Sequence, residues 1–587
     1  MVEKKTHGAN KTMKRWNIEE RPQAGQAELL ARQVGVSAVT AALLIERGIT
    51  TPERADAYLN PRLSRLHDPF LMRDMRKAVA RIETALARGE KILIYGDYDV
   101  DGATAVALVY KTLRRIEGSA ERLGFYIPDR YSEGYGISRQ GLDYASSGGF
   151  SLVIALDCGI KAVERMDEAR QRGIDFIICD HHVAGERLPD VAACLDPKRP
   201  DCQYPDKNLS GCGVGYKLME ALYISKGMDL NELTEHLDML VISIASDIVP
   251  MTGENRIFAH WGLKRLNSRP SVGLKAIMDV AGVDAGHAGI GDIVFKIGPR
   301  INAAGRMGDG ADAVRLLIST DPHEAMEMSS HMDGSNDERK DLDREITREA
   351  MDMICSSDEM RDASSIVVYK STWSKGVIGI VASRLTETFA RPAVVLTRSQ
   401  ADPRLATGSA RSVAGFDLYK GIESCADILE DFGGHTHAAG LTMRVENVPD
   451  FTRRFNRYVD ENTPEPDPTP TIDVDLEIGL ADINRGLIHE LEKMSPFGPG
   501  NEKPVFVTRG VYDYSTSKVF GHARQHLKLD MIETDGRDVR TGIGFGLGDM
   551  YRLIEDRQFD ICYTIDRNIY RGRPVVQLMI KDIHTRR

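Results

Sequence analysis

The sequence lacks several features that would place it among membrane, secreted or zinc-ribbon proteins. No apolar run reaches the 18 residues of a membrane span, and the N-terminus has no apolar signal segment. The eight cysteines form no C-x-x-C pair, which argues against a zinc ribbon or a redox motif of that kind. We therefore expect a cytoplasmic protein with no membrane partner. Several cysteines lie in apolar strand-like runs, such as Cys179, and are expected to be reduced core residues.

Excess positive charge is also missing. The chain of 587 residues has 76 basic and 87 acidic residues, a net charge of −11. A protein this acidic does not bind polyanions non-specifically, so any contact with nucleic acid requires local basic patches or bound cations. Aromatic residues are scarce at 6%, whereas there are 53 glycines. This mixture favours an α/β protein with tight strand–helix turns, and the length predicts two to four domains.

Apolar runs of strand length alternate with segments of helical periodicity in the first half of the chain. The strand-like runs are residues 91–95, 151–156 and 174–179, and the helical segments are residues 103–115 and 162–172. Such alternation predicts βαβ units and a parallel sheet covered on both faces. Asp157 and Asp180 each follow a strand, so we expect them to meet at the carboxyl edge of the sheet, where open α/β sheets bind ligands.

The rest of the chain divides into recognisable parts. Residues 333–355 are dense in charge at helical spacing, which predicts a solvated helix between two domains. A second α/β block covers about 363–445, and residues 461–471 read as a Pro-rich linker. Five strand-like runs follow the linker and predict a small barrel. The expected boundaries are a helical region at 1–85, a first α/β domain at 86–330, a connecting helix at 331–360, a second α/β domain at 361–460 and the barrel at 461–587.

Three closely spaced carboxylates follow the first strand, at Asp97, Asp99 and Asp101. In an extended chain all three point to one face, where they repel one another unless a cation neutralises them. An acidic surface loop is the alternative, but an apolar strand delivers these residues and Gly102 opens a helix behind them. The pattern favours a divalent metal.

Further acidic and imidazole groups follow other apolar runs: Asp157, the triplet Asp180-His181-His182, and Asp247. Carboxylates with one or two imidazoles suit Mn²⁺ or Mg²⁺ better than structural zinc. Several carboxylates around one pocket can hold two ions, which together activate a water and stabilise a phosphoryl displacement. The predicted reaction is metal-dependent phosphodiester hydrolysis.

At these motifs the sequence resembles a known family. DYDVDGATA, LDCGI, DHH and SDIVPM occur in the order found in DHH phosphoesterases. GPRINAAGRMGD, GVIGIVASRL, GSARS, GGHTHAAG and MSPFGPGNEKPVF are similar to those of the RecJ single-strand-specific exonucleases. The resemblance covers residue 30 to the end. It implies a parallel-sheet DHH domain, joined by the long helix to a second α/β domain (DHHA1), and a C-terminal oligonucleotide-binding (OB) barrel.

The resemblance also implies roles for individual residues. The implied metal ligands are Asp97, Asp99, Asp101, Asp157, His181 and Asp247. Besides the ligand His181, Asp180 and His182 are expected to take part in catalysis: Asp180 orients an imidazole, and His182 bonds a phosphate oxygen or the attacking water. The implied cofactors are two divalent ions, Mn²⁺ or Mg²⁺.

Four Gly-rich segments that carry Arg or His are interpreted as loops of a phosphate track, because small residues let backbone amides approach an anion and Arg gives bidentate donors. The implied substrate-binding residues are Arg130, Tyr135, Arg300, Asn302, Arg306, Ser409, Arg411, Ser412, Gly434 and His435. Lys375 and Gly376 are expected beside them.

The leading prediction is a 5′→3′ exonuclease that degrades single-stranded DNA to mononucleotides in recombination and repair. It would act as a monomer on a 5′ end, with a helicase and a single-strand-binding protein as candidate partners. One alternative is a phosphodiesterase for short oligonucleotides or cyclic dinucleotides, although such relatives usually lack the N-terminal helices and the barrel. The other is a catalytically dead DNA-binding scaffold, although dead relatives lose acidic ligands that this chain keeps.

Overall fold

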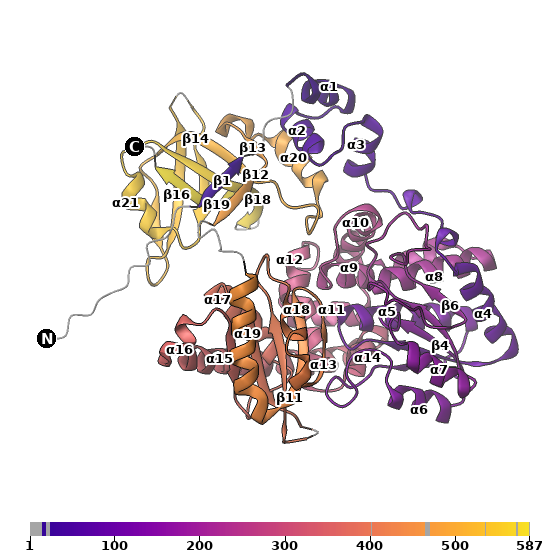
Figure 1. The fold of residues 1–587 in the computed structure, drawn as a ribbon. Helices are drawn as coiled ribbons and strands as arrows, with labels where there is room; N and C mark the ends of the chain where they lie inside the picture. Colours follow the sequence, from indigo (N-terminus) through magenta and orange to yellow (C-terminus); the bar gives the residue numbers. More distant parts are fainter. Residues whose placement is uncertain are drawn as a thin grey trace. The chain divides into compact units, whose positions relative to one another are not determined.

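The structure is a computed structural model, and it describes residues 14–18, 24–400, 402–463, 470–534, 536–570 and 573–585. The chain forms two compact units (Figure 1). One consists of Leu66–Pro466, and the other combines Met1–Arg65 with Asp467–Arg587. Among the described residues no single helix has the length and apolarity to cross a membrane, although the bent pair Gly25–Val34 and Ala38–Glu46 passes that test by length and composition.

The larger unit begins with a sheet of five parallel strands in the order β3-β2-β4-β5-β6. The strands are β2 (Lys91–Gly96), β3 (Leu123–Tyr126), β4 (Phe150–Leu156), β5 (Asp175–Cys179) and β6 (Ala193–Leu195). The central strands are buried on both faces, which explains their nearly continuous apolar sequences. The predicted parallel sheet is therefore confirmed.

Helices cover both faces of this sheet. The helices around it are α4 (Met75–Arg88), α5 (Val100–Glu117), α6 (Arg139–Ser147), α7 (Val163–Gln171) and α8 (Gly211–Lys226). Side chains of α6 and α7 share one core with alternate residues of β2, β4 and β5. Helices α4, α5 and α8 pack on the sheet as well. The turn from β2 into α5 is where the carboxylate motif lies.

A layer of further helices leads to the second α/β domain. They are α9 (Leu237–Ser246), α10 (Gly253–Ser268), α11 (Val272–Val280), α12 (Ile290–Asp292), the π-helical turn η4 (Ile293–Ile297), α13 (Gly298–Met307), α14 (Ala311–Ile318), α15 (Pro322–Ser356) and α16 (Asp358–Asp362). The predicted connecting helix is confirmed as α15, which is 35 residues long and capped by Asp321. It packs against α13 at one part and against α17 (Ile378–Phe389) at another.

The second domain is a mixed sheet in the order β10-β11-β9-β8-β7. Its elements are β7 (Ile366–Tyr369), β8 (Ala393–Arg398), β9 (Leu405–Arg411), α18 (Leu418–Glu423), β10 (Leu429–Gly434), β11 (Ala438–Arg444) and α19 (Val448–Asn462). Alternate strand residues face opposite sides: Val367 packs with α18 and α19, whereas Val368 packs with α15 and α17. The sheet is thus held between helices, and α19 is seen in front of it in Figure 1.

The smaller unit contains the predicted C-terminal barrel. Its strands are β12 (Thr471–Val474), β13 (Leu476–Glu477), β14 (Phe506–Asp513), β15 (Lys518–Phe520), β16 (His526–Glu533), β17 (Arg540–Gly544), β18 (Phe559–Tyr570) and β19 (Arg573–Thr585). Five of them close into a ring, β14-β16-β17-β19-β18, because β14 pairs with both β16 and β18. A closed five-stranded ring confirms the predicted OB-type barrel.

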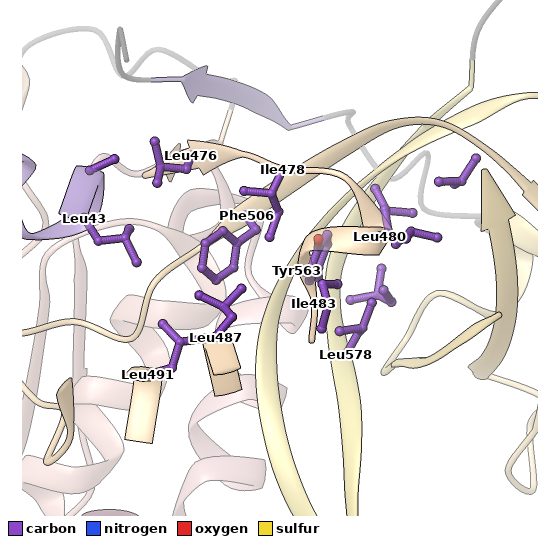
Figure 2. Close-up of a cluster of buried hydrophobic side chains, with 14 of the residues drawn as sticks. Leu43, Leu476, Ile478, Leu480, Ile483, Leu487, Leu491, Phe506, Tyr563 and Leu578 are labelled. Atoms are coloured by element: carbon purple, nitrogen blue, oxygen red, sulfur yellow. The ribbon is translucent and has the colours of Figure 1, made fainter. Parts of the chain in front are cut away.

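The N-terminal helices share a core with this barrel. They are α1 (Ala24–Val34), α2 (Ala38–Glu46) and α3 (Pro52–Leu59), and α20 (Arg485–Met494) lies among them. Figure 2 shows Leu43 of α2 beside Leu491 of α20 and Phe506 of the barrel, all in one buried cluster. Glu490 also accepts a hydrogen bond from the hydroxyl of Ser37 at 2.5 Å. The expected all-helical N-terminus is wrong at Arg15–Ile18, which forms a strand, β1, parallel to β12.

Candidate active site

The carboxylates and imidazole singled out in the sequence meet at the carboxyl edge of the parallel sheet. Asp97 follows β2 and Asp157 follows β4, while Asp247 ends α9. The Nε2 atom of His181 lies 3.1 Å from Asp157 Oδ1, 3.6 Å from Asp247 Oδ2 and 3.9 Å from Asp101 Oδ2. The topology thus brings together groups that are up to 150 residues apart (97 to 247) in the sequence.

The expected geometry of the first three carboxylates is wrong in one respect. They do not alternate along an extended chain, because β2 ends at Gly96 and α5 begins at Val100. Asp99 is the N-cap of α5 and accepts a hydrogen bond from the Gly102 amide at 3.0 Å. The helix start, rather than a strand pleat, therefore directs these side chains into the site. It also explains Gly102, because a β-carbon there would lie 2.4 Å from the carbonyl oxygen of Asp97.

Asp101 is held rigidly from behind. Its Oδ2 accepts a hydrogen bond from the Gly211 amide at 2.7 Å, and its Oδ1 accepts one from the Cys212 amide at 2.8 Å. The Ser243 hydroxyl donates to Oδ1 at 2.7 Å. The N-terminus of α8 and the middle of α9 therefore orient this carboxylate, as outer groups do around metal ligands.

Buried atoms without partners indicate what the site is built for. Within the described part of the chain, one carboxylate oxygen each of Asp97 and Asp157 and both ring nitrogens of His181 are buried and make no hydrogen bond. Ligand atoms of three groups lie within 4.8 Å of one another: Asp157–His181–His182, Asp101–His181–Asp247 and Asp97–Asp99–Asp157. Carboxylate oxygens and an imidazole nitrogen with a free lone pair are costly to bury without a partner, and a divalent cation would satisfy them.

The electrostatics agree with this interpretation. Burial raises the pKa of Asp97, and the charge of Asp99 raises it further. Burial and the charges of Asp101 and Asp99 raise the pKa of Asp247 to about 8. Burial lowers the pKa of His181, which keeps its imidazole neutral and able to bind a metal. The residues present fit Mn²⁺ or Mg²⁺, which accept carboxylate and imidazole ligands.

Asp180 does not point at this cluster. Its Oδ2 accepts a hydrogen bond from the Ile160 amide at 2.9 Å, and its Oδ1 lies 2.8 Å from Nδ1 of His182. Although burial favours the neutral form, the hydrogen bond and charge of His182 lower the pKa of Asp180 to about 2. Burial also favours the neutral form of His182, but the hydrogen bond and the charge of Asp180 outweigh it and raise the pKa of His182. Asp180 therefore contacts the imidazole of His182, and its expected role in orienting that ring stays a prediction.

Several predicted substrate residues line one pocket of about 490 Å³, together with Tyr98, the residue between Asp97 and Asp99. Arg130, Arg306, Ser409 and Arg411 are among its lining residues, and we call it the arginine pocket. The guanidinium of Arg130 stacks 4.6 Å from the ring of Tyr98, and Arg411 donates to Ser409 Oγ at 2.9 Å. Burial, and then the charges of Arg130, Arg339 and Arg411, lower the pKa of Arg306 to about 10. An anion bound here would relieve this repulsion.

Tyr135 and His435 lie elsewhere, at a second cavity that also contains Asp180 and His182. The Tyr135 hydroxyl lies 3.1 Å from the carbonyl oxygen of Asp157, to which it donates, and 3.2 Å from Nδ1 of His182. We call this cavity the His182 cavity.

Four predicted substrate residues line neither space. Arg300 pairs with Asp333 of α15 at 2.7 Å, and the Ser412 hydroxyl donates to the carbonyl of Phe416 at 2.8 Å. Asn302 lies half-buried on α13, and Gly434 ends β10 with a φ of +151°. A β-carbon on Gly434 would lie 2.4 Å from the carbonyl oxygen of Ala438.

The expectation of four Gly-rich loops is also wrong. Only residues 127–137 form a loop, whereas GPRINAAGR is helix α13, GSAR lies in β9, and the two glycines of GGH end β10. Glycine in these segments permits close packing rather than loop formation. Gly305, for example, packs against the backbone of Tyr98, where a β-carbon would lie 2.6 Å from the carbonyl oxygen.

Sequence reasoning missed the residues that support the site. Tyr98 and Tyr131 line the arginine pocket. Lys375 and Gly376, which were expected there, line it as well, and the carbonyl oxygen of Gly376 accepts a hydrogen bond from Arg306 at 2.9 Å. Ser243 supports Asp101 from a helix without any motif around it. The position of Tyr98 between two acidic residues predicted as ligands was the one available signal, since a residue there must lie next to the site.

Three family models match the chain. The DHH family N-terminal domain matches residues 91–244, the DHHA1 domain matches residues 362–461, and the RecJ OB domain matches residues 474–582. These segments contain the parallel sheet, the second α/β domain and the barrel, respectively.

Full-length comparisons agree. The chain is 39% identical over 570 residues to the single-stranded-DNA-specific exonuclease RecJ of Bacillus subtilis (strain 168), an alignment that covers 97% of this chain and 70% of the relative. The crystal structure of RecJ from Thermus thermophilus in complex with Mn²⁺ matches with a TM-score of 0.82 at 25% identity, covering 98% of this chain and 80% of that one. The Mg²⁺ complex of the same protein matches with a TM-score of 0.76 at 24% identity, covering 98% and 79%. The chain therefore belongs to the RecJ family of DHH phosphoesterases.

Proposed function

We propose that this protein is a divalent-cation-dependent exonuclease that degrades single-stranded DNA from the 5′ end to mononucleotides, in recombination and repair. The observation that carries the proposal is the convergence of five carboxylates and His181 around buried, unpaired ligand atoms. The proposed ligands are Asp97, Asp99, Asp101, Asp157, His181 and Asp247. Two Mn²⁺ or Mg²⁺ ions bound there would activate a water and stabilise both oxygens of the phosphoryl displacement.

The residues of the chain then have distinct tasks. Asp101 is fixed by α8 and α9, so it holds its position when a cation binds. Asp180 engages Nδ1 of His182 and leaves the other ring nitrogen for a phosphate oxygen or the attacking water. His182 is one-third exposed and lines an open cavity, as such a contact requires.

The arginine pocket would set the direction of degradation, from the 5′ end toward the 3′ end. We assign it to the 5′-terminal phosphate, because Arg130, Arg306 and Arg411 supply three guanidinium groups to one pocket, which is also lined by Tyr98, the residue between Asp97 and Asp99. A nucleotide whose 5′ phosphate is held here presents its 3′ phosphodiester to the carboxylate cluster, so cleavage releases one nucleotide at a time. Arg300, Asn302, Ser412 and Gly434 are assigned to holding α13, β10 and the turn after β9 in place.

The barrel is assigned a holding role for the single strand. In an OB barrel the face of the second and third strands binds oligonucleotides, and here those strands are β16 and β17. The ring of His526 lies 5.3 Å from Phe520 and 5.1 Å from Phe545, and Phe545 is 61% exposed. Lys518, which is exposed, lies on the same hairpin. Exposed aromatic rings beside basic side chains suit stacking on successive bases.

The net charge of −11 does not oppose DNA binding. Two divalent ions would add four positive charges at the site, and the arginine pocket is locally basic. We expect binding to weaken with salt in proportion to the phosphates contacted. Single-strand preference would follow if the space between the two α/β domains admits one strand only. Blunt duplex should therefore be degraded far more slowly than a 5′-tailed duplex, and equal rates would contradict this explanation.

Candidate partners of the proposed enzyme are a helicase that supplies single strands and a single-strand-binding protein. We propose that the protein is cytoplasmic and monomeric. Light scattering tests the monomeric state. A phosphodiesterase restricted to short oligonucleotides is the less favoured function, because the barrel offers a further face for a long strand.

One experiment tests the proposal directly. A single strand labelled at its 5′ end and the same strand labelled at its 3′ end are digested in parallel with Mn²⁺ or with EDTA. We expect immediate release of labelled mononucleotide from the 5′ label only, and no product with EDTA. Label released first from the 3′ end would contradict the polarity, binding without cleavage would indicate a scaffold, and cleavage limited to two- to five-mers would favour the alternative enzyme.

A further inference from the structure

The His182 cavity has no assigned occupant beyond its contact with His182. Its volume is about 680 Å³, within the roughly 300–1,000 Å³ typical of sites for small organic ligands. It is lined by the loop that carries Tyr135, by the turn after β4 with the start of α7, and by His435 of the second α/β domain. Both domains belong to the same compact unit.

The carboxylate cluster adjoins both this cavity and the arginine pocket through residues next to its members. Tyr98, between the ligands Asp97 and Asp99, lines the arginine pocket, whereas His182, next to the ligand His181, lines the cavity. A strand whose 5′ phosphate is in the arginine pocket and whose first phosphodiester is at the cluster must continue on the far side. The structure offers that strand the His182 cavity.

The lining has two chemically different parts. Ile137 and Ile160 are buried apolar residues, and with Val163 they give the cavity an apolar wall. Lys161 is exposed at the rim, and its charge and that of His182 contribute to a lowered pKa of His435, after burial. An apolar wall beside a cationic rim matches a nucleoside followed by a phosphate.

The remaining charged lining groups limit which side chain can hold that phosphate. Arg165 lies 3.2 Å from Glu168, with which it pairs, and Asp180 is occupied by His182. Glu164 is exposed and disfavours an anion near it. Lys161 is therefore the lining Lys or Arg side chain that makes no ion pair with any described residue.

We propose that the His182 cavity binds the second nucleotide of the single strand, with its base against Ile137, Ile160 and Val163 and its 3′ phosphate on Lys161. The inference rests on the proposed exonuclease function and extends it to the nucleotide that remains after each cut. That nucleotide becomes the new 5′ end, so the cavity holds the strand while the released mononucleotide leaves. Lys161 is a positioning residue, because it touches a phosphate that does not react.

The test uses a 5′-phosphorylated single strand with one neutral methylphosphonate linkage between its second and third nucleotides. We expect the wild-type enzyme to release the first nucleotide from this strand with about fivefold lower kcat/KM than from the unmodified strand, the order of an exposed charge pair. Lys161→Ala should lose about the same factor on the unmodified strand and show no further loss on the modified one. Lys420→Ala, which changes an exposed lysine of α18, is the matched control.

Two further measurements test whether the apolar wall of the His182 cavity contacts the base and whether positive charge at its rim favours binding. An abasic second nucleotide should raise KM for wild-type enzyme, and Glu164→Gln should lower KM for the unmodified strand. Equal effects of Lys161→Ala on both strands, or an abasic site without effect, would overturn the inference while leaving the exonuclease function standing. Absence of any cleavage of the unmodified strand by wild-type enzyme would instead overturn the proposed function and the inference with it.

Discussion

Gly211 lies directly against Asp157. A β-carbon at position 211 would lie 2.6 Å from the β-carbon of Asp157, and the Gly211 amide donates to Asp101 at 2.7 Å. One residue at the start of α8 therefore contacts two of the proposed metal ligands.

The first prediction concerns this contact. Gly211→Ala should displace Asp157 or the start of α8 and weaken Mn²⁺ binding roughly 10–100-fold, as loss of a supporting contact does at other metal sites. Isothermal titration of apoprotein with Mn²⁺ measures the effect. Gly213→Ala is the matched control on the same helix, because its added β-carbon meets its nearest neighbour at 3.4 Å, an ordinary contact. Equal affinities of the two variants would contradict the assignment.

The second prediction concerns His182. If its free ring nitrogen contacts the phosphate or the attacking water, His182→Ala should lower kcat by about 10²–10⁴-fold with little change in KM. Mn²⁺ affinity should stay within a few-fold of wild type, because His182 is not among the proposed ligands. His287→Ala, at an exposed histidine, serves as the control. An unchanged kcat would remove the catalytic role, and a large loss of Mn²⁺ affinity would make His182 a ligand.

The third prediction concerns pH. Burial and neighbouring carboxylates raise the pKa of Asp247 to about 8, well above that of the unfolded chain at about 3.9. Between those values the folded state binds more protons than the unfolded state, so this group makes metal-free protein less stable as pH rises. Thermal unfolding in EDTA should show a Tm that falls between about pH 6 and pH 8.

Two comparisons isolate the cause of that fall. Asp247→Asn should make the pH dependence in EDTA less steep, because one of the carboxyls with a raised pKa is gone. Saturating Mn²⁺ should also flatten it in the wild type, since a bound cation replaces the protons. If the Tm of the metal-free wild type instead rises between about pH 6 and pH 8, the prediction is wrong.

The fourth prediction concerns the arginine pocket. Arg411→Ala should reduce the preference for a 5′-phosphorylated strand over a 5′-hydroxyl strand by about tenfold or more, because a charge-assisted hydrogen bond is worth about 1.5–3 kcal/mol. The ratio of kcat/KM for the two strands measures it. Arg444→Ala, at an exposed arginine of the same sheet, should keep the wild-type ratio. If Arg411→Ala lowers both rates equally, the pocket does not bind the terminal phosphate.

The sequence predicts the fold well where the pattern is local. The run at 151–156 and the helical segment at 103–115 identify β4 and α5 to within a few residues. The strand is recognisable because it is buried on both faces, which requires a nearly continuous apolar sequence. Strand ends then place Asp157 and Asp180 at one edge. What the pattern could not give is side-chain direction: Asp180 turns toward His182, away from the cluster, because three backbone amides and an imidazole surround it.

Glycine-rich segments were the main source of error. In GPRINAAGR, small residues suggested a loop, yet α13 needs them where Gly305 packs on Tyr98 and Gly298 packs near Ser246. A contact between residues about 200 positions apart leaves no local signal. The same holds for Leu43 and Leu491, which lie in one buried cluster. This contact joins α2 to α20 in the smaller unit, although most of the chain separates the two leucines in the sequence.

The last prediction concerns the barrel. Phe545 is 61% exposed beside His526, so Phe545→Ala should remove a stacking surface without opening a cavity. We expect affinity for a long single strand to fall by about 1–3 kcal/mol, the range for a stacked base, with an unchanged dependence on salt because no phosphate contact is lost. Fluorescence anisotropy without divalent cations measures binding in the absence of cleavage. Leu553→Ala, at an exposed apolar residue of the same unit, should bind as wild type does. An altered salt dependence with Phe545→Ala would instead mean that the variant disturbs neighbouring basic side chains such as Lys518, and an unchanged affinity would exclude this face of the barrel from the path of the strand.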